Sequence, residues 1–214
     1  MLWDVVDIVE SVARCLQQRA EADDLEQAVR GIDVLDELAL HPLIHQALRR
    51  AGYGVWCEQH YPSDRAPRRS KSEGKRCDMV LTPDERVLAD SDADQTLFAP
   101  PDLVALEAAY WLEIKTVAQF TVEGPFPHYS KELLSSVAQD IKKLATDPSL
   151  HHAGLLLVLF TADAAVAEHD LSAWHDRCLR RSYAVAPPIQ RCFPITDRLG
   201  NAYLTCALFP VRRL

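Results

Sequence analysis

The chain has 214 residues, of which 48% are hydrophobic and 25% are charged, a composition typical of an ordinary globular protein. Its formal net charge of −8 at pH 7 opposes nonspecific adhesion to nucleic acid, because such adhesion is driven by Lys and Arg. The N-terminus carries acids where a secretory signal needs basic residues, and no apolar run reaches the roughly 20 residues of a membrane span, so we expect a cytoplasmic protein.

The first part of the chain has helical patterns. Apolar residues recur at helical spacing over residues 2–20 and predict an amphipathic helix. Asp23 and Asp24 are typical N-caps and predict a second helical piece over residues 25–30. A further helix is expected to start at Asp33 and to continue, with Pro42 in the first turn of the continuation, to residue 50. We interpret residues 1–32 as an N-terminal helical extension and residues 33–214 as the main domain.

Strand patterns follow this helical region. Residues 55–61 and 77–81 predict two strands, and the polar segment between them predicts a loop. The acidic segment 84–101 predicts a loop or a short extra hairpin, followed by a helical turn over residues 102–109. The apolar stretch 110–117 predicts the central strand of a sheet.

The last part of the chain alternates helices and strands. Residues 131–145 and 164–181 have helical patterns, and residues 154–161 are apolar at almost every position, as in a strand buried on both faces. Short strands are expected over residues 183–186, 191–195 and 202–210. The pattern predicts an α/β fold, a mixed central sheet flanked by helices.

The six cysteines are scattered along the chain without any CxxC spacing. Such spacing predicts neither a zinc site nor a disulfide network, and favours small buried apolar residues. The cysteines are Cys15, Cys57, Cys77, Cys178, Cys192 and Cys206.

The loop over residues 64–76 is the most basic stretch of this acidic protein. It can act as a solubilising loop or as a phosphate-binding loop, and its place just before the second predicted strand favours contact with phosphates. Its basic residues are Arg65, Arg68, Arg69, Lys71, Lys75 and Arg76.

Three charged residues of the predicted strands suggest chemistry. Glu113 and Lys115 are two residues apart in the central strand, so both side chains point to the same face. Asp78 lies near the start of another apolar strand and can meet them at one edge of the sheet. Two carboxylates suit a hard divalent cation such as Mg²⁺, and a neighbouring lysine can orient or deprotonate a bound water. The simpler alternative is an exposed ion pair on an edge strand.

Asp78 followed by Glu113, Ile114 and Lys115 resembles the signature of the PD-(D/E)XK nuclease superfamily, which has the restriction-endonuclease-like fold. Residues 37–44 and 52–58 resemble the family's first helix, with its acid, and its first core strand. The helix over residues 131–145 resembles the family's next helix, which often carries a Gln where Gln139 stands. The chain departs from the pattern at Cys77, where Pro is common, and in the long segment between Asp78 and Glu113.

The resemblance implies Mg²⁺- or Mn²⁺-dependent hydrolysis of nucleic acid, most often by a DNA endonuclease. It implies a metal site made of Asp78, Glu113 and the backbone carbonyl of Ile114, with Lys115 acting on the attacking water and Gln139 orienting Lys115 or a phosphate. Glu37 and Glu58 are further candidate acids of this site. The alternative is a nucleic-acid-binding or assembly subunit that kept the fold without the chemistry.

The sequence contains nothing that resembles a separate DNA-reading module such as a helix-turn-helix or a zinc finger. We therefore expect weak, sequence-indifferent and salt-sensitive binding to DNA, carried mainly by the basic loop. Useful affinity is expected to come from self-association, or from a second protein docked on the apolar face of the N-terminal helix between Leu2 and Leu16.

Overall fold

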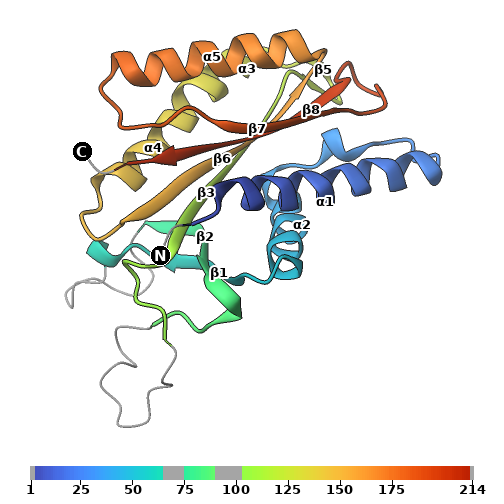
Figure 1. Ribbon diagram of the computed structural model, residues 1–214. Helices are drawn as coiled ribbons and strands as arrows, with labels where there is room; N and C mark the ends of the chain where they lie inside the picture. Colours follow the sequence, from blue (N-terminus) through green and yellow to red (C-terminus); the bar gives the residue numbers. More distant parts are fainter. Residues whose placement is uncertain (1–2, 65–74, 90–102, 213–214) are drawn as a thin grey trace.

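Six strands form one mixed sheet in the computed structural model, which describes residues 3–64, 75–89 and 103–212 (Figure 1). In the order in which they pair, they are β1 (Gly54–His60), β2 (Arg76–Thr82), β3 (Tyr110–Ala118), β6 (His152–Thr161), β8 (Tyr203–Val211) and β7 (Ile189–Pro194). β3 and β6 are parallel, and the other neighbouring strands are antiparallel. The predicted α/β class with a mixed sheet is confirmed.

Helices cover both faces of this sheet (Figure 1). α1 (Val5–Leu25) and α2 (Glu37–Arg50) lie on one face. α4 (Val137–Thr146) and α5 (Ala164–Arg180) lie on the other face. α4 is preceded by the short α3 (Tyr129–Lys131) and by a π-helical turn, Glu132–Ser136, so β3 is connected to its parallel neighbour β6 by a helical crossover.

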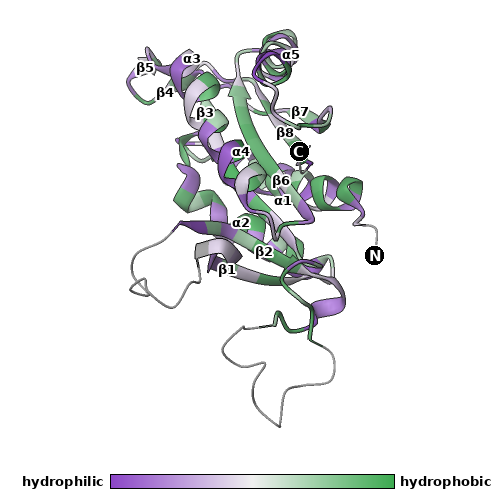
Figure 2. Cartoon of the chain, turned by 90° about the vertical axis from the view of Figure 1, so that its left-hand side faces the viewer, coloured by the Kyte–Doolittle hydropathy of each residue, from purple (hydrophilic) through white to green (hydrophobic). Residues whose placement is uncertain are grey.

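The core consists of two apolar layers, one on each face of the sheet. Trp111, Leu155 and Leu157 face α4 and α5, whereas Leu112 and Leu156 belong to the layer under α1 and α2. Figure 2 shows the centre of the sheet coloured as hydrophobic, in agreement with the continuous apolar pattern of β6. Strand alternation explains why neighbouring residues of β3 belong to different layers.

α1 packs into the same core as the sheet. Its residues Ile8, Val12 and Leu16 are fully buried in the layer that also contains residues of β3, β6 and β8. The apolar face of the predicted N-terminal extension is therefore covered by the protein itself. Ile8, Val12 and Leu16 are therefore not available to a partner protein, whereas Val6 on the same helix is 42% exposed. Docking of a partner on this helix stays a prediction.

One predicted helical piece is absent from the described residues. Residues 26–30 contain a turn and bends, because α1 continues through Asp23 and Asp24 and ends at Leu25. Residues 103–109 contain a hydrogen-bonded turn in which Ala109 N–H donates to the Ala105 carbonyl. Asp36, and not Asp33, caps α2, and Pro42 lies inside that helix. None of the helices in the described ranges is long and apolar enough to cross a membrane.

β2 and β3 separate partway along their length. Their pairing joins Met79–Leu81 to Tyr110–Leu112, whereas β3 continues beside β6 as far as Ala118. The Cys77 thiol donates to the Leu112 carbonyl at 3.3 Å, at the point where the pairing stops. Among the described strands, none pairs with residues 113–118 on the β2 side. The separation creates a gap between Asp78 of β2 and residues 113–118 of β3, which we call the fork. It contains the charged residues singled out from the sequence.

Candidate active site

Asp78 closes the fork between β2 and β3. Its Oδ2 accepts a hydrogen bond from the backbone N–H of Ile114 at 2.7 Å. In a strand, the N–H and C=O of one residue point to the same side, so the Ile114 carbonyl is also directed into the fork. Asp78 and the Ile114 carbonyl, two of the three expected metal ligands, therefore lie on the same side of β3.

Glu113 is the buried acid of the site, with only 2% of its surface exposed. The Tyr61 hydroxyl donates to its Oε1, and the Lys143 ammonium lies 3.8 Å from its Oε2. Burial, followed by the negative charge of Asp78, raises the pKa of Glu113 to about 8, although Tyr61 and Lys143 act in the opposite direction. This raised pKa reflects the electrostatic cost of a buried carboxylate beside Asp78.

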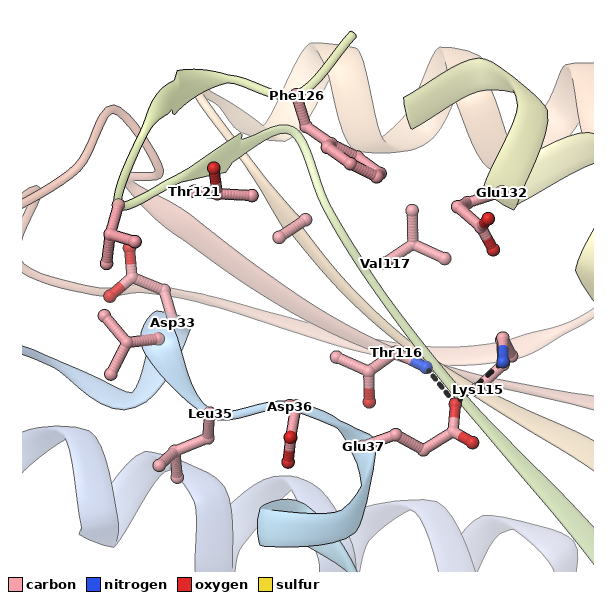
Figure 3. Close-up of a pocket in the computed structure, with 13 residues that line it drawn as sticks. Asp33, Leu35, Asp36, Glu37, Lys115, Thr116, Val117, Thr121, Phe126 and Glu132 are labelled. Carbon is pink, nitrogen blue, oxygen red and sulfur yellow. Dashed lines mark hydrogen bonds and ion pairs between the residues drawn. The ribbon is translucent and has the colours of Figure 1, made fainter. Parts of the chain in front are cut away.

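Lys115 is paired with Glu37, which comes from the first turn of α2. The Lys115 Nζ lies 3.1 Å from Glu37 Oε2, and the same oxygen accepts the Thr116 N–H at 3.2 Å (Figure 3). Asp36 caps the helix by accepting the Ala39 N–H at 2.8 Å, which fixes the position of the neighbouring Glu37.

The charge of Lys115 is stabilised by this pairing. Partial burial lowers its pKa, but the charge of Glu37 and the hydrogen bond to it outweigh that effect, so the pKa is raised above its ordinary value. Lys115 is therefore a permanent cation, suited to stabilising negative charge and not to removing a proton from water.

Gln139, which was expected to orient Lys115, is exposed on α4. The interior-facing residues of this part of the helix are its neighbour Asp140 and the apolar Val137 and Ile141. Gln139 is the exposed position between the buried Ala138 and Asp140, so its side chain lies on the solvent side of α4. The contact to Lys115 comes instead from Glu37, which corrects that part of the role predicted for Gln139, whereas an orienting contact of Gln139 to a phosphate stays a prediction.

Glu58 is exposed on β1, but its backbone is unusual. Its neighbours Cys57 and Gln59 pair with Met79 and Cys77, which places Glu58 opposite Asp78 in the register. Glu58 has a left-handed φ of 54°, a conformation that is costly for a residue with a Cβ. The negative charges of Glu58 and Asp78 both contribute, after burial, to a raised pKa of the Cys57 thiol. Glu58 thus lies beside the fork, at its exposed edge.

The structure adds three residues that the sequence interpretation missed. Tyr61 and Lys143 contact Glu113 directly, and Asp140 accepts from Lys143 at 2.6 Å. The spacing of Asp140 and Lys143, three positions apart on a predicted helix, is a signal for a pair that faces one side. Tyr61 has no comparable signal, because its contact to Glu113 spans 52 positions of the chain.

The predicted nucleic-acid-binding residues are only partly described. Arg65, Arg68, Arg69 and Lys71 lie outside the described residues. Lys75 and Arg76 are exposed at the start of β2, with Arg76 paired in the register with His60.

A cleft with a volume of about 420 Å³ opens beside Lys115 (Figure 3). Its walls are the N-terminal turn of α2, the second half of β3, and the hairpin of β4 (Phe120–Thr121) and β5 (Gly124–Pro125). Apolar residues such as Val117 and Phe126 line it, together with four acids. The acids are Asp33, Asp36, Glu37 and Glu132. This cleft is electrostatically unfavourable for a phosphate unless cations are present.

The donor set at the fork fits a hard divalent cation. Two carboxylates and a carbonyl are oxygen ligands, and the like-charge effect of Asp78 on the pKa of Glu113 is the repulsion that such a cation relieves. Within residues 3–64, 75–89 and 103–212, no group of three or more His, Cys, Asp or Glu side chains is arranged to hold a metal ion. Water would therefore have to complete the coordination, as is usual for Mg²⁺.

Comparisons of this chain with protein-family models, with curated proteins and with solved structures find no match. The class that the fold defines is an α/β protein with a mixed six-stranded sheet. The interpretation of the site therefore depends on the geometry of its own residues.

Proposed function

We propose that this protein is a metal-dependent nuclease that hydrolyses phosphodiester bonds of DNA, with a restriction-endonuclease-like arrangement of its sheet. The single observation that carries the proposal is the fork between β2 and β3. There Asp78 accepts the Ile114 N–H at 2.7 Å, directly beside the buried Glu113, and Lys115 projects from the same strand. This cluster costs folding free energy, and a catalytic role explains why the charges are gathered there.

Each residue has a distinct task in this proposal. Asp78, Glu113 and the Ile114 carbonyl would hold the divalent cation. When bound, the ion would supply Lewis-acid chemistry, lowering the pKa of a bound water and neutralising charge on the phosphate. Lys115, kept protonated by Glu37, orients the attacking water and stabilises the negative charge that develops on the phosphoryl oxygens.

Glu37 is a positioning residue in this scheme. Its carboxylate holds the Lys115 ammonium and the Thr116 N–H at the same time, so it ties the start of α2 to the second half of β3. A lysine with a flexible four-carbon chain needs such a partner to keep one orientation.

The test is cleavage of plasmid and linear DNA by the purified protein with Mg²⁺, with Mn²⁺ and with EDTA. We expect cleavage that requires the metal, and loss of both metal binding and cleavage in Asp78→Ala and Glu113→Ala. Glu168→Ala, which removes an exposed acid on α5, is the matched control and should cleave normally. Unchanged cleavage in Asp78→Ala would refute the proposal.

An absence of cleavage on duplex, single-stranded and branched DNA and on RNA would favour the alternative, a binding or assembly subunit without chemistry. In that case the wild type should still bind nucleic acid in the presence of EDTA.

A further inference from the structure

Lys143 lies inside the cluster of acids, although the proposed reaction does not use it. Its Nζ is 2.6 Å from Asp140 Oδ1 and 3.8 Å from Glu113 Oε2, and 30% of its side chain is exposed. It projects from α4, whereas Lys115 projects from β3 and is paired with Glu37 of α2. The two lysines thus belong to two separate ion-pair groups.

The charged groups that shift the pKa of Lys143 are acids. Partial burial lowers its pKa, but the hydrogen bond that Lys143 donates to Asp140 and the charges of Glu113, Asp140 and Asp78 raise it. An ammonium placed this way offsets part of the repulsion between the acids of the fork. A divalent cation bound by Glu113 would need the same electrostatic position, and two cations on one carboxylate repel each other.

We propose that the Lys143 ammonium occupies the position of the cation in the metal-free site. When a divalent cation binds, Lys143 moves away from Glu113, and its ammonium then contacts a phosphate of the substrate. The inference rests on the proposed nuclease function. Three features support it. The 3.8 Å separation from Glu113 means that the ammonium is only loosely held there. The exposed fraction of the side chain leaves room for it to move outward, and the aliphatic chain of lysine is flexible. Asp140 keeps the displaced side chain near the site.

The test is a calorimetric titration of the full-length protein with Mn²⁺, for the wild type, Lys143→Met and Lys142→Met. Lys142 is the matched control, because it is the neighbouring lysine on the same helix but is exposed. We expect Lys143→Met to bind Mn²⁺ about tenfold more tightly than the wild type, since no ammonium competes for the carboxylates. Lys142→Met should bind as the wild type does, and Lys143→Gln serves as a second variant should Lys143→Met fold poorly.

Cleavage at saturating Mn²⁺ gives the second readout. We expect Lys143→Met to cleave about tenfold more slowly, because the lost charge would have neutralised one phosphate contact. Equal or weaker Mn²⁺ affinity in both Lys143 variants would overturn the inference while leaving the nuclease proposal intact. Tighter Mn²⁺ binding with unchanged cleavage would overturn the phosphate contact. A wild type that binds no Mn²⁺ would overturn the nuclease proposal and this inference together.

Discussion

The two halves of β3 are built for different purposes. Residues 110–112 pair with β2 on one edge and with β6 on the other, and their side chains are buried apolar groups. Residues 113–118 keep β6 as a partner, but on the other edge the side chains of Asp78 and Glu37 take the place of a strand. The comparison shows how one strand combines a rigid anchor with a charged site. The paired half fixes the position of β3 in the sheet, and the open half presents backbone N–H groups and charged side chains to the fork.

The largest effect on stability is expected in the paired half. Trp111 is fully buried and its indole N–H donates to the Leu106 carbonyl at 2.9 Å. Trp111→Ala should lower the free energy of unfolding by about 3–5 kcal/mol, because it removes buried apolar surface and leaves a cavity. Urea unfolding measures this loss, and Val122→Ala, at a residue that is 58% exposed, is the control with little effect. A loss of under about 1 kcal/mol would contradict the assignment of this half as the anchor.

In the open half, the largest effect should be on turnover. Lys115→Ala removes a charge that is held beside the site by Glu37, and we expect metal to bind but turnover to fall about 10²–10³-fold. Single-turnover cleavage at saturating Mn²⁺ isolates this step from metal binding. A variant that loses metal affinity but, once saturated, turns over normally would show that Lys115 helps to hold the ion and not the transition state.

The charged half should also make stability depend on pH. The pKa of Glu113 is raised from 4.5 to about 8 in the folded protein. The folded state therefore binds more protons than the unfolded state between these values, and stability falls as the pH rises through that window. The contribution is fully present below about pH 4.5 and declines by up to about 1.4 kcal/mol per pH unit toward pH 8.

Urea unfolding of the metal-free protein at pH 5, 6, 7 and 8 measures this dependence. Glu113→Gln lacks the titrating group and should show a flatter profile over the same range. Identical slopes for the wild type and this variant would mean that Glu113 does not titrate in the window, and would remove the electrostatic reason for placing a cation at the fork.

The smallest effect is expected at the exposed edge of the fork. Glu58→Gly should raise the free energy of unfolding by about 0.5–1 kcal/mol, because Gly adopts a positive φ without the Cβ clash that Glu58 suffers at φ 54°. Glu58→Ala keeps the Cβ and should give no such gain. Thermal unfolding of the two variants separates backbone strain from the loss of the carboxylate, and equal stabilities would show that the strain is negligible.

Local patterns in the sequence were sufficient for the main elements of the fold. The alternation of β3, the uninterrupted apolar run of β6 and the helical stripe that includes Val137, Ile141 and Leu144 each report burial directly, and all three elements formed as predicted. The short strand pattern at residues 183–186 failed, since only Val185 makes an isolated bridge, to Val211. A pattern of this length carries too little burial to decide its structure.

The geometry of the site was much less predictable. Whether Asp78 meets Ile114 depends on where β2 leaves β3, and the contacts at that point, such as that of the Cys77 thiol with the Leu112 carbonyl, join residues far apart in the sequence. Whether Gln139 or Asp140 faces the site depends on the rotation of α4 about its axis. This helix follows a π-helical turn, which local sequence propensities do not predict. Tyr61 approaches Glu113 only after β1 and β3 have been placed in the sheet.

Along the open half of β3, side chains and not a neighbouring strand bond to the backbone, and this has a consequence for self-association. The N–H groups of Ile114 and Thr116, two positions apart on one edge, are the donors that an added strand would need, and the carboxylates of Asp78 and Glu37 already occupy them. Charged groups at such an edge discourage edge-to-edge pairing between molecules. Variants that remove both acids would uncover a template for strand addition, so an inactive double variant such as Asp78→Ala with Glu37→Ala is expected to aggregate on storage at concentrations at which the wild type remains monodisperse in light scattering.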